Sequence, residues 1–308
     1  MKRTNSDFLI FASILLPAVL FCAAGWLTIP AADRAVVSGL LAGLVLVANG
    51  LLLFLTGDRV MNETSPLAPV IYIVLAAANP AALSLTPLHA ASFLLALSML
   101  FHLLYCAIRP SLGYLAIAWA TLGCAALCFP PLAWLAPVYA ITTAPSAEEK
   151  GKYTVALILS FILPAGIWIG IQYLRGTGLP VNVLRGLWTD MTVIHRPTLH
   201  FSAATLCRIL LTVLATVLAV IHILRRLTRY RTAQYHAFLR LLVLTLALVV
   251  LNLVFLSDSR QPFGLLTLLP VTLLLNEYFR DRNAEKGAGL LAVILALVLV
   301  VERITCFV

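Results

Sequence analysis

Charged residues are scarce in this sequence. Asp, Glu, Lys and Arg make up 11% of its 308 residues, whereas about a quarter of a soluble domain is charged. Hydrophobic residues make up 62%, and apolar runs long enough to cross a bilayer as helices recur along the whole chain. The composition therefore excludes a soluble globular protein and predicts one integral membrane domain over residues 1–308.

Most sequence signatures of catalysis are also missing. None of the six cysteines forms a Cys-x-x-Cys pair and all lie in apolar segments, so neither a disulfide framework nor a zinc site is predicted. We find no glycine-rich phosphate loop, no Ser/His/Asp arrangement and no paired acidic residues inside a span. The sequence predicts no metal and no other cofactor.

The net charge of +9 does not indicate a nucleic-acid partner, because the basic residues lie between apolar runs. Five arginines fall in residues 225–240, which we call the basic linker. Short loops rich in Lys and Arg stay on the cytoplasmic side of a bilayer. The linker therefore fixes the predicted orientation, and the lipid bilayer is the predicted partner.

We expect an all-α polytopic bundle of about eleven transmembrane helices, with a range of 10–12. The expected spans are approximately residues 8–29, 35–56, 67–85, 88–108, two short spans within 113–144, 153–174, 201–224, 241–256, 263–278 and 289–301.

The ambiguous segment is 113–144, which Pro130 and Pro131 interrupt. Two successive prolines remove two helix donors, so we expect a hairpin of two short spans. One kinked helix is the alternative, and it would invert everything downstream. With the hairpin, the larger share of Lys and Arg falls on the linker side and the N-terminus is cytoplasmic, so the charge bias favours the hairpin.

A first candidate site lies on the side away from the linker. Arg208, Thr205 and Thr212 share one helix face, and polar residues inside a span should face protein. Arg208 either extends to the headgroups or forms the floor of an outward-open cavity. The preceding link adds residues suited to an anionic, lipid-linked substrate, or to an ordinary amphipathic loop that presses Trp188 into the interface: Arg185, Asp190, His195, Arg196 and His200.

A second candidate is the stripe Ser98, His102, Tyr105 and Arg109, spaced four, three and four residues apart. His102 is the one histidine well inside a predicted span, so it is either a functional residue or a hydrogen-bonded packing residue. His89 and His102 are about 20 Å apart along one helix and cannot share a metal ion. Asn49 and Asn252 are expected to join helices, and Glu277 to pair with Arg280.

Several stretches carry a resemblance: Asp58-Arg59-Val60-Met61-Asn62, Phe129-Pro130, Leu269-Pro270 and Asn276-Glu277-Tyr278-Phe279. With these the chain resembles a family of multi-pass inner-membrane proteins of Bacteroides-type bacteria, a domain-of-unknown-function family. The resemblance implies an inner-membrane, cell-envelope setting and supplies no activity.

Three functional classes stay open. The first is a non-catalytic envelope protein that assembles with other membrane proteins or handles a lipid or small molecule as a transporter does. The second is a lipid-linked glycan transferase or polymerase with the extracytoplasmic Arg/His site. The third is a membrane metal oxygenase of the carotenoid-cleaving type.

Overall fold

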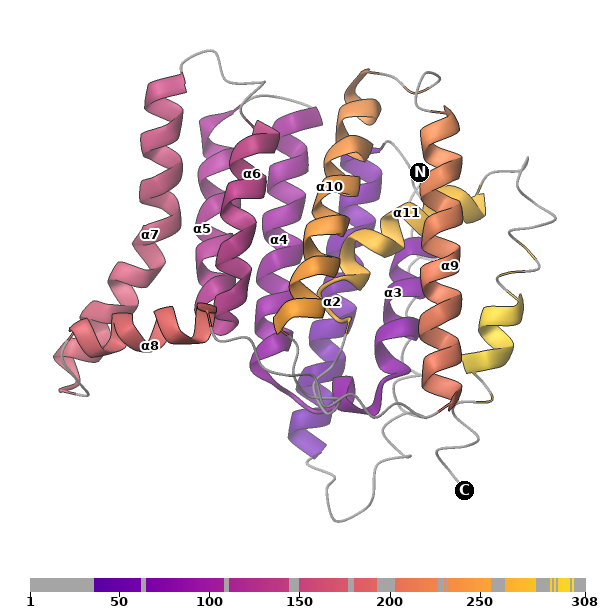
Figure 1. The fold of residues 1–308 in the computed structure, drawn as a ribbon, viewed down its shortest axis with the longest axis horizontal. Helices are drawn as coiled ribbons and strands as arrows, with labels where there is room; N and C mark the ends of the chain where they lie inside the picture. The colour runs from indigo at the N-terminus through magenta and orange to yellow at the C-terminus, as the bar shows by residue number, and fades with distance from the viewer. Residues whose placement is uncertain are drawn as a thin grey trace, which may run out of the picture.

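The computed structural model is helical in all of its described elements, which confirms the all-α prediction for this part of the chain (Figure 1). The described residues are 36–61, 65–107, 111–143, 150–176, 180–192, 203–226, 230, 232–255, 264–280, 289, 291, 293–299 and 301. The first predicted span lies outside them, and residues 289–301 are described only in part.

Five helices of the described chain are long and apolar enough to cross a membrane. A helix rises about 1.5 Å per residue, so each reaches about 30 Å or more, the thickness of the hydrocarbon layer. These helices confirm the prediction of a membrane protein with several apolar helices. They are α2 (Val36–Val60), α4 (Pro87–Ala107), α7 (Lys150–Leu174), α9 (Ala203–Arg226) and α10 (Thr232–Phe255).

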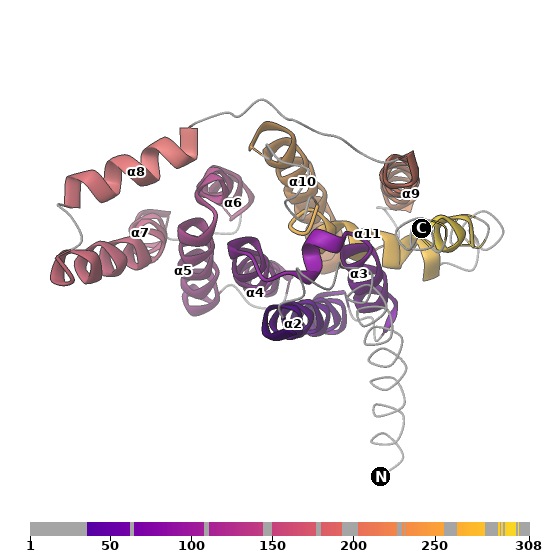
Figure 2. The ribbon, with the colours of Figure 1, turned by 90° about the horizontal axis from the view of Figure 1, so that it is seen from below.

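The other elements are shorter than a full span. They are α3 (Leu67–Ala77), η2 (Pro80–Leu83), α5 (Leu112–Cys128), η3 (Pro130–Trp134), α6 (Leu135–Thr143), α8 (Pro180–Thr192) and α11 (Leu268–Arg280). Helix α8 lies across one end of the bundle, beside η3 (Figures 1 and 2).

The chain turns back on itself at the double proline. Ser98 of α4 is hydrogen-bonded both to the Ala118 carbonyl of α5 and to the Tyr139 hydroxyl of α6. In a straight helix, residues 118 and 139 would be about 30 Å apart, so α5 and α6 form a hairpin around η3. The predicted turn at the double proline is confirmed, but the predicted pair of spans is not, because α6, with nine residues, is too short to cross a membrane alone.

The basic linker is shorter than predicted. Helix α10 begins at Thr232, well before the expected start at Leu241, so Arg240 belongs to a helix and not to a loop. Arg240 is buried in that helix, with 8% of its surface exposed. The prediction was wrong because it ended the linker at the last basic residue instead of at the first helical turn.

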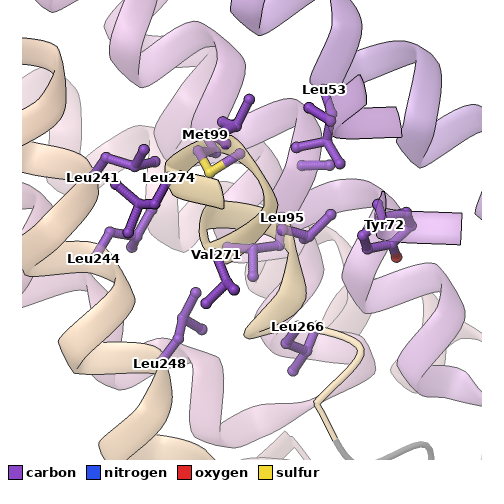
Figure 3. Packing of buried hydrophobic residues seen from close by; sticks show 14 of the residues in the cluster. Leu53, Tyr72, Leu95, Met99, Leu241, Leu244, Leu248, Leu266, Val271 and Leu274 are labelled. Atoms are coloured by element: carbon purple, nitrogen blue, oxygen red, sulfur yellow. The ribbon is translucent and has the colours of Figure 1, made fainter. Parts of the chain in front are cut away.

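Helix α11 forms the centre of the core. Each residue from Leu269 to Tyr278 is buried, as expected for a helix surrounded by protein. Figure 3 shows Val271 and Leu274 of α11 among side chains of α4 and α10, including Leu95, Met99 and Leu244. The span predicted over 263–278 began too early. Residues 264–267 form a turn with Gly264 at φ +87°, and the helix begins at Leu268.

Helix α7 lies at the edge of the bundle and packs on α5 through Gly123. A β-carbon at Gly123 would lie 2.4 Å from the Phe161 carbonyl oxygen and 3.3 Å from the Pro164 ring. Only a glycine lets the two backbones come this close. The remaining sides of α7 expose large apolar side chains such as Leu159 and Leu163, which lipid covers in a bilayer.

We expect Gly123→Ala to destabilise the protein by about 1–3 kcal/mol, because the Phe161 backbone cannot move without shifting α7. Thermal unfolding of the purified protein in detergent measures the change. Gly170→Ala is the matched control on α7, since its β-carbon would meet no atom within 4 Å. The control should keep or slightly raise stability, and equal melting temperatures for the two variants would contradict the close contact.

Candidate functional site

Polar side chains gather where α4, α5, α6 and α10 meet. Ser98 and His102 lie on one face of α4, as their spacing predicts, and that face meets the α5–α6 hairpin. Arg109, the last member of the predicted stripe, lies outside the described residues. We call the group the His102 cluster and define it as Ser98, His102, Tyr105, Tyr139, Thr142 and Arg240.

His102 is held by α6 on two sides. Its ring lies against the Tyr139 ring, with 4.2 Å between the centroids, and its Nε2 lies 3.0 Å from the Thr142 hydroxyl oxygen. The Thr142 hydroxyl donates its own proton to the carbonyl of Val138 (2.9 Å) or of Tyr139 (3.0 Å). The Thr142 oxygen therefore accepts from His102 Nε2–H, and we assign His102 Nδ1 as a bare acceptor.

Two polar atoms of the cluster are buried without a hydrogen-bond partner. They are His102 Nδ1 and the Tyr105 hydroxyl, in side chains whose residues are 3% and 1% exposed. A buried polar atom without a partner costs about 1–3 kcal/mol. Such atoms are rare in folded proteins and call for a specific explanation.

Arg240 supplies the positive charge of the cluster from α10. Its Nε donates to the Thr142 carbonyl oxygen at 2.9 Å, so Thr142 joins His102 and Arg240. Buried charges need hydrogen bonds or partners, and inside membrane helices they are usually functional.

The sequence interpretation missed Arg240, although a signal was present. Ala237, Phe238, Leu241 and Leu244 repeat at helical spacing and are all buried. This pattern begins before Arg240 and continues past it, so it places Arg240 inside a helix. The contact with Thr142 itself, between residues 98 positions apart in the chain, has no local signal.

A second polar group joins α2, α3 and α4. Asn49 Nδ2 donates to the Tyr72 hydroxyl and to Ser92 Oγ, both at 2.9 Å. Asn252 Nδ2 likewise donates to Thr267 Oγ1, joining α10 to the turn before α11. Asn49 joins helices, as the sequence predicted, whereas Asn252 joins a helix to a turn.

The histidines of α4 are kept apart. His89 Nε2 lies 2.8 Å from the Ala82 carbonyl oxygen, at the opposite end of α4 from His102. Because the two histidines lie thirteen residues apart on one helix, they are too far apart to bind the same metal ion. Among the described residues, no group of three or more His, Cys, Asp or Glu is arranged to hold a metal ion.

Arg208 supports the end of a neighbouring helix. Its Nη1 donates to the Leu75 carbonyl oxygen of α3 at 3.2 Å. The N–H groups of Ala78 and Asn79 go to Val74 and Ala76, which leaves the Leu75 carbonyl for Arg208. A cation at a helix C-terminus is also favoured by the helix dipole. Arg208 thus contacts the end of α3.

The threonines beside Arg208 bond to their own helix. Thr212 donates to the Arg208 carbonyl at 2.9 Å, and Thr216 donates to the Thr212 carbonyl at 2.7 Å. Thr205 is half-buried on the same helix. Threonines inside a membrane helix commonly satisfy their hydroxyls in this way.

The described part of the link before α9 is an amphipathic helix, α8. Its exposed apolar face carries Val181, Leu184 and Trp188, which is 62% exposed. Trp134 of η3 fastens the helix by donating from Nε1 to the Met191 carbonyl at 3.1 Å. The amphipathic character agrees with the sequence, and the position at a membrane interface stays a prediction.

The structure does not bring the described residues of the first candidate site together. Arg185 and Asp190 are exposed on α8, which lies on the opposite side of the bundle from α9 and Arg208 in both views (Figures 1 and 2). His195, Arg196 and His200 lie outside the described residues, so their place in a site stays a prediction.

Glu277 is buried at the end of α11, with 5% of its surface exposed. It accepts a hydrogen bond from the Tyr230 hydroxyl at 2.8 Å and pairs with Arg280 at 3.4 Å. The predicted ion pair is confirmed, and Tyr230 attaches the basic linker to the central helix.

Comparison with protein-family models, with curated proteins and with solved structures finds no match. The resemblance to an inner-membrane family of unknown function therefore stays a prediction.

We expect Arg208→Ala to destabilise the protein by about 1.5–3 kcal/mol, because the Leu75 carbonyl loses a charged donor inside the bundle. Thermal unfolding in detergent measures the loss. Arg185→Ala on exposed α8 is the control and should change stability by less than about 0.5 kcal/mol. A stable Arg208→Ala protein would contradict a supporting role for Arg208.

Proposed function

We propose that this protein is a non-catalytic, multi-pass protein of the bacterial inner membrane that binds and handles a small molecule or a lipid headgroup, as a transporter does. The ligand binds at the His102 cluster. The chain crosses the membrane several times, with the N-terminus and the basic linker in the cytoplasm.

One observation carries the proposal: His102 and Tyr105, one helical turn apart on α4, each keep a buried polar atom without a hydrogen-bond partner, and a buried arginine lies near His102. Arg240 and His102 come from different helices and share Thr142. Residues this costly to bury in a membrane protein usually mark a substrate or ion pathway. Arg208, the alternative centre, is engaged by the Leu75 carbonyl, which favours a structural role for it.

The orientation is supported by how basic residues gather at one end of the bundle. Gln234 at the start of α10 donates to the Met61 carbonyl at 2.7 Å, so the ends of α2 and α9 and the start of α10 lie together. Arg59, Arg225 and Arg226 occupy the last turns of α2 and α9. Basic segments stay in the cytoplasm, so α8 lies at the extracytoplasmic surface.

A topology experiment tests this orientation. In a variant without the six native cysteines, we expect a cysteine at Trp188 to react in intact cells with a maleimide that cannot cross the inner membrane. A cysteine at Arg225 should react only after lysis. The opposite pattern would invert the proposed topology.

The ligand itself is tested by native mass spectrometry of the protein purified in mild detergent. We expect a co-purified molecule that is retained by wild type and lost from Arg240→Gln, because the variant removes the buried charge. Arg59→Gln is the matched control, since the Arg59 side chain is 69% exposed, and it should retain the molecule. Retention by both variants, or no bound molecule in wild type, would contradict the proposal.

A further inference from the structure

His102 joins α4 to α6 through Tyr139 and Thr142, and we call this contact the α4–α6 interface. The His102 ring lies against the Tyr139 ring, with 4.2 Å between the centroids and 37° between the ring planes. Its Nε2–H donates to the Thr142 hydroxyl oxygen at 3.0 Å, because the Thr142 hydroxyl gives its own proton to a carbonyl of α6. One ring nitrogen of His102 is thus fixed by Thr142, and the other, Nδ1, is assigned a lone pair and no proton.

The closed α4–α6 interface has no place for a proton on His102 Nδ1. A proton there would create a second N–H, and no polar atom of the described residues is placed to bond to Nδ1. It would also create a positive charge in a residue that is 3% exposed. A charged group that is buried without a hydrogen-bond partner is much less stable than the same group in water. A protonated His102 therefore needs water at Nδ1, which requires α6 to move away from α4.

Helix α6 is the side of the interface that can move. It has nine residues, compared with 21 in α4, and the double proline of η3 interrupts the chain before it. Besides the contacts of His102, single hydrogen bonds join Tyr139 to Ser98 and the Thr142 carbonyl to Arg240. Short elements that are held by few bonds are the first to open in a folded protein.

No other group at the interface is expected to change its charge near neutral pH. Ordinary tyrosines and cysteines lose their protons only above about pH 8, and arginine keeps its charge throughout. No Asp or Glu of the described chain forms an ion pair with His102. The titratable and charged groups around the interface are Tyr105 and Cys106 on α4, Tyr139 on α6, Tyr153 on α7 and Arg240 on α10.

We propose that His102 is a proton-controlled switch: the α4–α6 interface is closed while Nδ1 is bare and opens when Nδ1 binds a proton. The proton comes from water during a transient opening and binds to the Nδ1 lone pair. The bond that breaks is the hydrogen bond from Nε2–H to Thr142. The inference goes beyond the function proposed above, since it needs neither the ligand nor a particular net charge around Arg240.

His89 is the matched histidine for a comparison, because it is buried on the same helix but has a polar neighbour at each ring nitrogen. Its Nε2 lies 2.8 Å from the Ala82 carbonyl oxygen, and its Nδ1 lies 3.0 Å from the Thr86 hydroxyl oxygen. A hydroxyl can accept as well as donate, so a protonated His89 keeps a partner on both sides. Only the Thr86 N–H, which is 3.2 Å from Nδ1, would lose its acceptor. His89 can therefore take up a proton without separating two helices.

Hydrogen–deuterium exchange of the full-length protein in detergent measures the opening, because the amides of α6 lose protection when the interface opens. Exchange in residues 135–143 is compared at pH 7.5 and pH 5.5, with the unfolded protein as the correction for the intrinsic pH dependence. We expect exchange in wild type to be about ten times faster at pH 5.5, since a water-exposed histidine has a pKa of about 6.5 and is then mostly protonated. Helix α2, which supplies no residue to the interface, is the internal reference and should not change.

The variants assign the response to one ring. His102→Gln keeps an N–H for Thr142 but binds no proton in this pH range, so we expect its α6 exchange to be equal at the two pH values. His89→Gln should keep the tenfold change. Thr142→Val is a second test in case His102→Gln does not fold. It removes the acceptor of the Nε2–H bond, so α6 should exchange faster than in wild type already at pH 7.5.

Four results would overturn the inference: α6 exchange in wild type that is equal at the two pH values, a tenfold change that persists in His102→Gln, a change that disappears in His89→Gln, or wild-type exchange at pH 7.5 in Thr142→Val. None of them decides the ligand proposed above, because loss of a co-purified molecule from Arg240→Gln is measured at a single pH.

Discussion

A polar group inside an apolar bundle has no water to bind, and this constraint accounts for most of the contacts between distant helices. Arg208 donates to the Leu75 carbonyl, which lies at the end of α3. Asn49 joins Tyr72 to Ser92. The threonines of α9 donate to their own helix. His102 and Tyr105, like Asn49 and Trp119, each keep a buried polar atom without a hydrogen-bond partner. The first two lie one turn apart on α4, and a buried arginine lies near His102, which marks this place for function.

The general architecture could be predicted from the sequence because its signals are local. Apolar runs give the long helices, and Pro130 with Pro131 gives the turn between α5 and α6, since a proline acts on its own and the preceding residue. The boundaries near Arg240 and Leu268 were wrong. Helix α10 begins at Thr232, and the apolar pattern that runs through Arg240 was overlooked. At the second place a turn over 264–267 precedes the central helix, and its residues are as apolar as the helix itself.

Only the part of the His102 cluster that lies on α4 could be predicted from the sequence. The spacing of Ser98, His102 and Tyr105 gives one face of α4, which follows from helix geometry alone. That Thr142 and Arg240 complete the group depends on how the α5–α6 hairpin and α10 fold against α4, and no local pattern encodes this contact. Arg185 and Arg208 show the reverse case, because the sequence grouped them in one candidate site but the fold places α8 and α9 on opposite sides of the bundle (Figure 2).

The central place of α11 has a consequence for biosynthesis. Residues 268–280 are surrounded by α2, α3, α9 and α10, all of which leave the ribosome earlier. The helices made first therefore cannot complete their shared interior until translation has passed Arg280. A chain released before that point would keep the faces of Leu95, Met99 and Leu244 uncovered, and the membrane quality-control machinery would meet it as an incomplete product.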